Sequence, residues 1–340
     1  MKRNQWFRAG VFLCALVTAL TCMTRIFENK SPDAVSKEFA KNTGRKFDVI
    51  FLGPSTMKND IYPMELYHSY GIAAYNLACG SQSVAESYYL AESAIEKYQP
   101  DLLVLDVFMV PYEGNYLTDG QLHFVTDAMR GMDRWKIVKD MVPEGQRGQF
   151  LFELSVYHDR WKELEEQDFR RTGDITYGAK LNTTVKEIRS YTITTEKKQL
   201  PDQSEEYLGR LLELCQNKGV ELLLVNLPVD FGAKHGVMGD MEKMQMYYNA
   251  VHDFAADHQI RYWNYMDCTD EIELDPAKDY DGGYHLNIRG AEKLTDFMGR
   301  YITENYSLHD RRSDSGYDDM KEDYILYEQY KEEQRMILNQ

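Results

Sequence analysis

Three residues whose types suit acyl transfer are spread across this chain of 340 residues. Ser55 directly follows an apolar run, and His285 comes four residues after Asp281 towards the other end of the chain. A serine hydroxyl is a weak nucleophile until a neighbouring histidine takes its proton, and a carboxylate that orients the histidine completes the set. Taken alone, Ser55 is better interpreted as a serine that caps a helix after a strand. The role of Ser55 therefore depends on whether the fold brings the three side chains together.

The elements that would position these residues are strands alternating with helices. Gly53-Pro54 ends a short apolar run just before Ser55, which predicts a buried parallel strand and a tight turn. Comparable runs recur along the chain, and the strands are expected at 47–52, 73–77, 101–106, 220–226 and 260–265. The alternation predicts an α/β three-layer sandwich with a central, mostly parallel five-stranded sheet. In such a sheet the loops after the first and last strands reach the same edge, where ligands gather.

Helical patterns separate the strands, and one long segment interrupts the alternation of strands and helices. Helices are expected at 32–42, 61–70, 84–98, 203–217, 241–258, 288–301 and 318–337. Residues 107–200 break the alternation and are interpreted as a helical insertion or cap over the sheet edge, with helices near 121–140 and 150–170. Its aromatic side chains could stack on sugar rings, although core packing is the commoner role: Tyr112, Tyr116, Phe124, Trp135, Tyr157 and Trp161. His158 and Trp161 would share one helix face, in what we interpret as a packed structural helix.

The N-terminal segment, 1–30, has the pattern of a signal anchor or signal peptide. Lys2, Arg3 and Arg8 precede an apolar run from Ala9 to Met23. The run is shorter than the roughly 20 residues that span a bilayer, unless the preceding Trp-Phe pair lies at the interface. With the positive charges inside, we expect a single-pass cell-membrane protein with an extracellular folded domain, or a secreted one if the segment is cleaved.

Composition limits the classes of partner and cofactor. A formal net charge of −16 argues against nucleic-acid binding, which needs a concentrated basic face. Cys79, Cys215 and Cys268 lie outside the N-terminal run and form neither a disulfide framework nor a zinc-binding pattern, so buried free thiols are expected. No metal or nucleotide motif is present, and no cofactor is expected. We expect an α/β domain over 31–306, followed by a charged tail or surface helix over 307–340.

The order of these motifs resembles the SGNH (GDSL-like) hydrolase superfamily. In that family the nucleophilic serine lies in a Gly-Asp-Ser-like block after the first strand, here Gly53-Pro54-Ser55-Thr56. The second block, a strand followed by an oxyanion glycine, is similar to the segment ending in Gly80 and Ser81. The last block would supply Asp281 and His285 before the C-terminal helix. The resemblance covers roughly residues 45–106 and 203–303, and it implies an oxyanion hole of backbone N–H groups from Ser55 and from Gly80 or Ser81.

The chain also departs from that pattern. The family spacing is Asp-x-x-His, but Gly282 occupies the expected position, so Asp279 rivals Asp281 as the residue that orients His285, and a Ser–His dyad is a further alternative. The third block, Gly-x-Asn-Asp, is replaced by Asp106-Val-Phe-Met. Loss of one oxyanion donor typically costs about 100- to 1,000-fold in rate. The α/β-hydrolase elbow G-x-S-x-G is excluded, because Met57 stands at its final glycine.

Exported, membrane-anchored SGNH proteins are similar in build to this chain. Examples are the alginate and peptidoglycan O-acetyltransferases and the D-alanyl transfer protein of teichoic acid synthesis. The resemblance implies O-acetyltransferase or esterase activity on a cell-envelope polysaccharide, through an acyl-Ser55 intermediate and beside a multi-spanning membrane O-acyltransferase. Two alternatives stay open: an inactive SGNH-fold subunit that binds glycan or scaffolds the acyltransferase, and an unrelated α/β binding protein with a structural Ser55 and His285.

Overall fold

A computed structural model describes residues 2–27, 39, 45–112, 119–129, 131–151, 162, 164, 174–234 and 239–340. At its centre is a five-stranded sheet of order β2-β1-β3-β4-β5, in which all neighbouring strands are parallel. The strands are β1 (Val49–Gly53), β2 (Ala74–Ala78), β3 (Leu102–Asp106), β4 (Glu221–Asn226) and β5 (Arg261–Asn264). The expected α/β sheet is confirmed, and each strand begins and ends within one or two residues of the run that predicted it.

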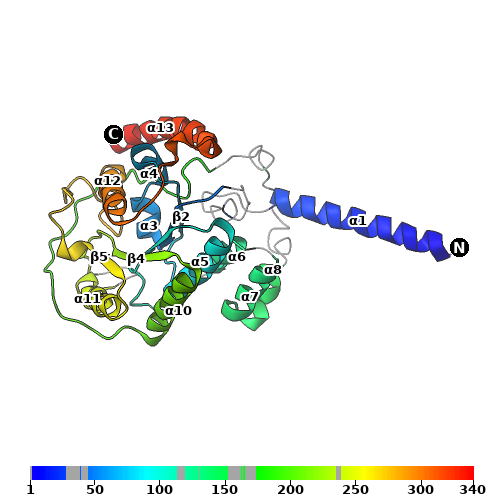
Figure 1. Cartoon of the computed structure of the whole chain (residues 1–340), viewed down its shortest axis with the longest axis horizontal. Coiled ribbons are helices and arrows are strands. Elements are labelled where there is room, and N and C mark those ends of the chain that lie inside the picture. The colour runs from blue at the N-terminus through cyan, green and yellow to red at the C-terminus, as the bar shows by residue number, and fades with distance from the viewer. Residues whose placement is uncertain are drawn as a thin grey trace.

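Helices cover both faces of the sheet (Figure 1). One layer contains α3 (Ser55–Asp60), α4 (Pro63–Tyr70) and α12 (Ile288–Asn305), with α13 (Asp318–Leu338) packed outside against α4. The other contains α5 (Val84–Tyr98), α10 (Asp202–Lys218) and α11 (Met241–Asp257). Because both faces are covered, the strands β1, β2 and β3 are buried along their whole length, as in other parallel sheets.

The helix expected at 61–70 is confirmed as α4, which begins two residues later, and a separate short helix, α3, precedes it. Tyr62 is extended (φ −108°, ψ 99°) because Pro63 disfavours helical geometry in the residue before it. Pro63 then begins α4, where its missing N–H has no helical partner to lose. Ser55 is the first residue of α3, and the residue that caps this helix is Pro54. The interpretation of Ser55 as a helix cap is therefore wrong.

The insertion is helical only in part. Instead of one helix at 121–140 there are two, α6 (Asp119–Asp127) and α7 (Gly131–Met141), followed by a 3₁₀ turn (Glu144–Gln146) and α8 (Arg147–Leu151). Residues 174–201 form a turn at 175–178 and then irregular backbone with a β-bridge at Lys186, and they are rich in threonine and other β-branched residues, which have low helix propensity. Apart from Phe39, the expected helix 32–42 lies outside the described residues, as does most of 150–170.

The aromatic residues of the insertion occupy different environments. Phe124 is buried, Tyr112 is partly buried against the main core, and Trp135 is exposed. The remaining positions singled out from the sequence, Tyr116, Tyr157, His158 and Trp161, lie outside the described residues. Core packing therefore accounts for Phe124 and Tyr112, whereas Trp135 faces solvent.

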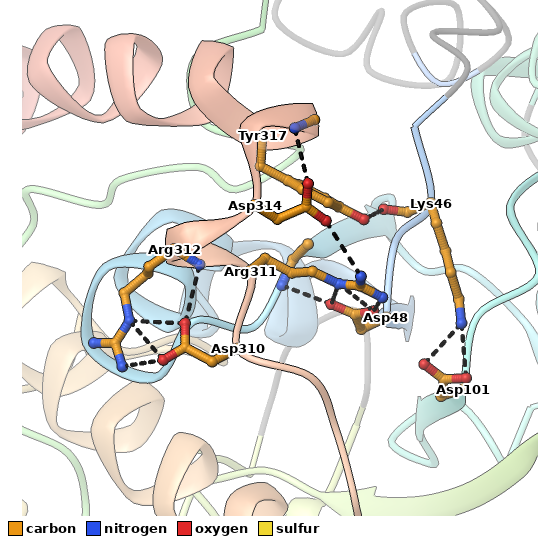
Figure 2. A network of polar contacts seen from close by, with 10 residues as sticks. Lys46, Asp48, Asp101, Asp310, Arg311, Arg312, Asp314 and Tyr317 are labelled. Atoms are coloured by element: carbon orange, nitrogen blue, oxygen red, sulfur yellow. Dashed lines mark hydrogen bonds and ion pairs between the residues drawn. The ribbon is translucent and has the colours of Figure 1, made fainter.

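The residues that follow α12 are attached to the amino-terminal edge of the sheet (Figure 2). Arg311 forms an ion pair of 2.6 Å with Asp48, whose side chain is fully buried just before β1. The backbone N–H of Arg311 donates to the carbonyl of Gly71 at 2.9 Å, and the hydroxyl of Tyr317 donates to the carbonyl of Lys46 at 2.8 Å. This network lies at the edge opposite the loops that carry Ser55 and His285.

The surface helix α13 is held by a buried cation. Lys331 has a side chain only 5% exposed and forms ion pairs with Glu65 of α4, Glu292 of α12 and Glu328 of α13 itself. Met320, Tyr327 and Leu338 of α13 are buried as well. The expected charged tail or surface helix thus includes a long helix packed on the α/β domain.

The N-terminal helix α1 (Lys2–Phe27) is long and apolar enough between Gln5 and Met23 to cross a membrane. Its large apolar side chains are exposed, including Trp6 at 78% and Phe7 at 74%. An anchor and a signal sequence share these properties, so α1 fits either function. Farther along the chain, Cys79 and Cys215 are buried, as expected, whereas Cys268 is half-buried.

Candidate active site

Ser55 lies where the order of the strands changes direction. The chain passes from β1 to β2 on one side and then returns to add β3 on the other side of β1. Ligands of open α/β sheets bind outside the carboxyl ends of the strands at such a switch point. Ser55 is half-buried there, and its carbonyl accepts a hydrogen bond of 2.6 Å from the Asn59 side chain within α3.

His285 lies between Ser55 and Asp281. Its Nε2 atom is 2.9 Å from Oγ of Ser55, and its Nδ1 atom is 2.8 Å from Oδ2 of Asp281. A carboxylate can only accept, so Nδ1 carries the proton of a neutral imidazole, and Nε2 is left to accept from the serine hydroxyl. The structure therefore brings the predicted serine, histidine and aspartate into one hydrogen-bonded chain.

The carboxylate of Asp281 is surrounded by donors. Its Oδ1 atom accepts from the backbone N–H groups of Gly283 at 2.8 Å and His285 at 3.3 Å. Burial acts to raise the pKa of Asp281, but the His285 side chain and these backbone donors outweigh it, and the pKa lies below its ordinary value. Asp281 is thus ionised at neutral pH and able to stabilise a protonated His285.

Asp279, the rival aspartate, points elsewhere. Its Oδ2 atom accepts from the ammonium group of Lys293 at 2.8 Å and from the backbone N–H of Asp275 at 2.7 Å. Its side chain is only 3% exposed. Between the two aspartates that the sequence left open, the structure places Asp281 against His285.

Two residues that the sequence analysis did not select hold the loop between β5 and α12. Asp60, at the end of α3, accepts from the backbone N–H of Leu286 at 3.0 Å, and burial raises its pKa. Asn287 caps α12 by accepting from Arg289 N–H at 3.0 Å, and its amide donates to Lys278 O at 2.7 Å. An asparagine directly before an expected helix is a general signal for an N-cap, whereas the contact of Asp60 needed the three-dimensional arrangement.

The predicted oxyanion residues lie in the turn after β2. Ser55 and Gly80 each come two residues beyond the register partners Gly53 and Ala78 of the adjacent strands β1 and β2. The N–H of Cys79 donates to the carbonyl of Gly53 at 3.3 Å, which attaches this turn to the end of β1. Gly80 is exposed, and Ser81 has a φ of +54°, a conformation that is uncommon outside glycine. The turn is thus held at the end of β1, near Ser55, with Gly80 exposed.

Asp106 stands where the third sequence block of the superfamily would begin. One carboxyl oxygen accepts from the hydroxyl of Thr56, the residue after Ser55, and the other accepts from Phe108 N–H at 3.0 Å. Burial raises the pKa of Asp106 to about 7, against the opposing effect of these two hydrogen bonds. Gly53 makes this approach possible, because a Cβ there would lie 2.8 Å from the Cβ of Asp106 and its φ is +148°.

These groups suffice for nucleophilic chemistry on an ester. Ser55 could attack a carbonyl carbon, His285 could carry the proton, and backbone N–H groups could face the developing negative charge. Within the described part of the chain, no group of three or more His, Cys, Asp or Glu residues is placed to hold a metal ion. The residues present at this edge are those of acid–base and nucleophilic catalysis.

No protein-family model matches this chain, and comparison with curated protein sequences found no match. Similar solved structures include a GDSL-like lipase from Bacteroides thetaiotaomicron, at 10% identity and a TM-score of 0.40, covering 76% of this chain and 88% of that one. An acetyl-xylooligosaccharide esterase from Geobacillus has 12% identity and a TM-score of 0.40, covering 78% and 97%. A psychrotrophic esterase from Pseudoalteromonas has 9% identity and a TM-score of 0.36, covering 76% and 97%. Because these similarities are low, the function of this chain is inferred from its own side chains.

Proposed function

We propose that this protein is a serine-dependent acyl-transfer enzyme, acting as an esterase or an O-acetyltransferase through an acyl-Ser55 intermediate. The observation that supports the proposal most is the continuous chain from Ser55 Oγ to His285 at 2.9 Å and from His285 to Asp281 at 2.8 Å. Neither a structural serine nor a helix cap requires a histidine held by a carboxylate in this order.

In the first step, Ser55 Oγ attacks the carbonyl carbon of an acyl ester, and Nε2 of His285 takes the hydroxyl proton. The negative charge on the former carbonyl oxygen is stabilised by backbone N–H groups of Ser55 and of Gly80 or Ser81. The tetrahedral intermediate then breaks its bond to the leaving alcohol, which receives the proton from His285. The products of this step are acyl-Ser55 and the free alcohol.

In the second step, an acceptor hydroxyl gives its proton to His285 as its oxygen attacks the acyl-Ser55 carbonyl. Ser55 leaves and recovers the proton from His285, so atoms and charges balance over the cycle. Water as the acceptor makes the reaction a hydrolysis, and a sugar hydroxyl makes it a transfer. Asp281 remains ionised throughout and orients the imidazole.

The substrate that we propose is the acylated hydroxyl group of a cell-envelope polysaccharide. The apolar helix between Gln5 and Met23 supports attachment to a membrane, or passage across one, with the folded domain outside the cell. A multi-spanning membrane O-acyltransferase that supplies the acyl group is part of this proposal. An acetylated carbohydrate is the first substrate class to test.

An inactive SGNH-type subunit is the second candidate, and Asp106 is the observation that favours it. This carboxyl occupies the third-block position and accepts from Thr56 and Phe108. In its ionised form this group has no proton to donate to an oxyanion, in contrast to an asparagine amide. Such a subunit would bind glycan or an acyltransferase with Ser55 unreactive.

A serine-reactive phosphonate separates the two candidates. We expect the full-length protein in detergent to be labelled on the peptide that contains Ser55, and the label to disappear in Ser55→Ala and decrease strongly in His285→Ala. Equal labelling of the wild type and Ser55→Ala would contradict the enzyme proposal. Absence of label from all three proteins would favour the inactive subunit.

A further inference from the structure

An extended segment of the insertion, residues 180–191, crosses the loop that carries Asp281 and His285, and we call it the strap. Its backbone is attached at several points: Lys180 N–H donates to Lys58 O at 2.9 Å, and Lys186 N–H donates to Tyr280 O at 2.9 Å. Ile188 N–H donates to Pro276 O at 3.1 Å. The strap is therefore fastened both to α3, which begins with Ser55, and to the loop before α12.

One strap side chain reaches the proposed catalytic carboxylate. The amide nitrogen Nδ2 of Asn182 lies 3.0 Å from Oδ2 of Asp281 and 3.3 Å from the carbonyl of Leu286. Oδ2 is also the oxygen that faces Nδ1 of His285 at 2.8 Å. The backbone carbonyl of Asn182 accepts from Ile288 N–H at 2.9 Å, which sets the distance between the strap and the start of α12.

Asn182 adds one donor to the hydrogen bonds that hold the Asp281 carboxylate. Oδ1 has two backbone donors from its own loop, Gly283 and His285. Oδ2 has the imidazole and the Asn182 amide, and the Asp281 side chain is only 16% exposed. Without Asn182 the oxygen that faces the histidine would keep the imidazole as its side-chain donor, and the plane of the carboxylate would be less constrained.

The strap also restrains the backbone around Asp281. Gly282 has a φ of +77°, and a Cβ at this position would lie 2.5 Å from Cδ of Lys186. Arg189 pairs with the buried carboxylate of Asp230 at 2.6 Å, and Asp230 N–H donates to Gly283 O at 3.1 Å. The strap thus contacts the loop through Lys186 and supports it indirectly through Asp230.

We propose that Asn182 is a positioning residue, which holds the Asp281 carboxylate so that His285 presents Nε2 to Ser55. This inference rests on the proposed function of the same site. It assigns part of the catalytic arrangement to the insertion, the part of the chain that matches no sequence block of the superfamily. Asn182 acts through Asp281 and touches neither the serine nor the reacting ester.

The test uses full-length Asn182→Ala and Asn182→Asp, with Thr184→Ala as the matched control, since Thr184 lies in the same strap and its side chain is exposed. With 4-nitrophenyl acetate, we expect Asn182→Ala to lose about 100-fold in kcat with little change in KM, the typical cost of a misplacement of ~1 Å. Thr184→Ala should keep the wild-type kcat. Thermal unfolding of each variant identifies losses that come from misfolding.

The pH profile distinguishes positioning from simple structural support. Loss of the Asn182 amide leaves Asp281 a stronger acceptor for protonated His285, so the acidic limb of kcat/KM should move to higher pH. In Asn182→Asp two carboxyls face each other, and turnover should recover towards lower pH, where one of them holds a proton to donate. Folded Asn182→Ala with the kcat and pH profile of Thr184→Ala would overturn the inference.

A nuclear magnetic resonance measurement keeps the inference testable if the protein has no turnover. The proton between His285 Nδ1 and Asp281 gives a signal that can be assigned by its loss in His285→Ala. We expect this signal to shift or broaden in Asn182→Ala and to stay unchanged in Thr184→Ala. An unchanged signal in Asn182→Ala would overturn the positioning role, whereas equal turnover of the wild type and Ser55→Ala would overturn only the proposed function.

Discussion

The Nε2 atom of His285 lies 2.9 Å from Oγ of Ser55, although 230 positions separate the two residues in the chain. The distance is short because β1 and β5 belong to one parallel sheet, so the loops that follow them emerge at the same edge. Asp281, in the second of these loops, completes the arrangement through Nδ1 of the imidazole. The proposed reaction depends on this relationship, and each residue in it can be tested separately.

Asp281→Asn should reduce kcat far more than Asp279→Asn. An amide in place of the Asp281 carboxylate favours the wrong tautomer of His285, a change that costs about 10,000-fold in other Ser-His-Asp enzymes. Asp279 pairs with Lys293 instead, so its replacement should lower thermal stability and leave kcat within roughly tenfold. Steady-state hydrolysis of an acetyl ester gives kcat for both variants. A larger kcat loss in Asp279→Asn would reassign the orienting aspartate.

Gly80→Pro should lower kcat, whereas Gly80→Ala should change it little. Proline removes the backbone N–H that we assign to the oxyanion hole, and loss of one such donor typically costs about 100- to 1,000-fold. Alanine keeps the N–H, and a Cβ at this position would meet no heavy atom within 4 Å. The measurement is kcat for the same ester with both folded variants. Equal rates for the two would show that the N–H of Gly80 faces no developing charge.

Asp106→Asn should make the stability of the protein less dependent on pH. Burial raises the pKa of Asp106 to about 7 in the folded protein, while the unfolded carboxyl has a pKa of about 3.9. Between these values the folded state holds a proton that the unfolded chain has lost. This contribution is therefore complete below about pH 4 and is lost as the pH rises through about 7, on the order of 4 kcal/mol in total.

Urea unfolding at several pH values measures this dependence. Burial also raises the pKa of Glu86 to about 7, so Glu86 contributes with the same sign, and Asp106→Asn should remove only part of the slope. A variant with the wild-type slope would show that Asp106 is already ionised in the folded protein at low pH. The two proteins are compared by the slope of the free energy of unfolding against pH, because the substitution also changes the hydrogen bond with Phe108 N–H.

Arg311→Ala should destabilise the protein much more than Arg312→Ala. Arg311 is 15% exposed and compensates the fully buried Asp48, and removing one partner of a buried pair costs about 3 to 5 kcal/mol. Arg312 and its partner Asp310 are both about half exposed, and such pairs contribute about 0 to 1 kcal/mol. Urea unfolding of the two variants gives the difference, and similar losses would contradict the burial argument. Since both arginines lie at the edge opposite Ser55, kcat of the folded protein should be unchanged.

Much of the fold could be predicted from sequence because it follows from local patterns. The apolar run before Gly53-Pro54 and the run ending at Asp106 each became a buried strand, as alternation with helices predicts a parallel sheet. The start of α4 was placed two residues too early, although Pro63 was a local signal against helical geometry in the residue before it, and α3 was not among the expected helices. The extended strap could not be predicted in the same way, because its backbone hydrogen bonds go to Lys58, Tyr280 and Pro276, far from it in sequence.

The candidate site, too, could be predicted only in part from the sequence. Ser55 and His285 could be selected because their types and their places after strands follow general chemical rules. Asp281 and Asp279 could not be distinguished, since the choice depends on which carboxylate the ammonium group of Lys293 engages. Asn182 and Asp60 carried no sequence signal, because an amide or a carboxyl that holds a loop has no characteristic spacing.

Acylation of Ser55 itself is the most direct test of this account. The full-length protein is mixed with 4-nitrophenyl acetate, quenched in acid and mapped by peptide mass spectrometry, beside Ser55→Ala and His285→Ala. We predict one acetyl group on the peptide that contains Ser55, none at that peptide in Ser55→Ala, and a strong decrease in His285→Ala. Ester turnover that persists in Ser55→Ala, with no acetyl group on Ser55 in the wild type, would contradict the account.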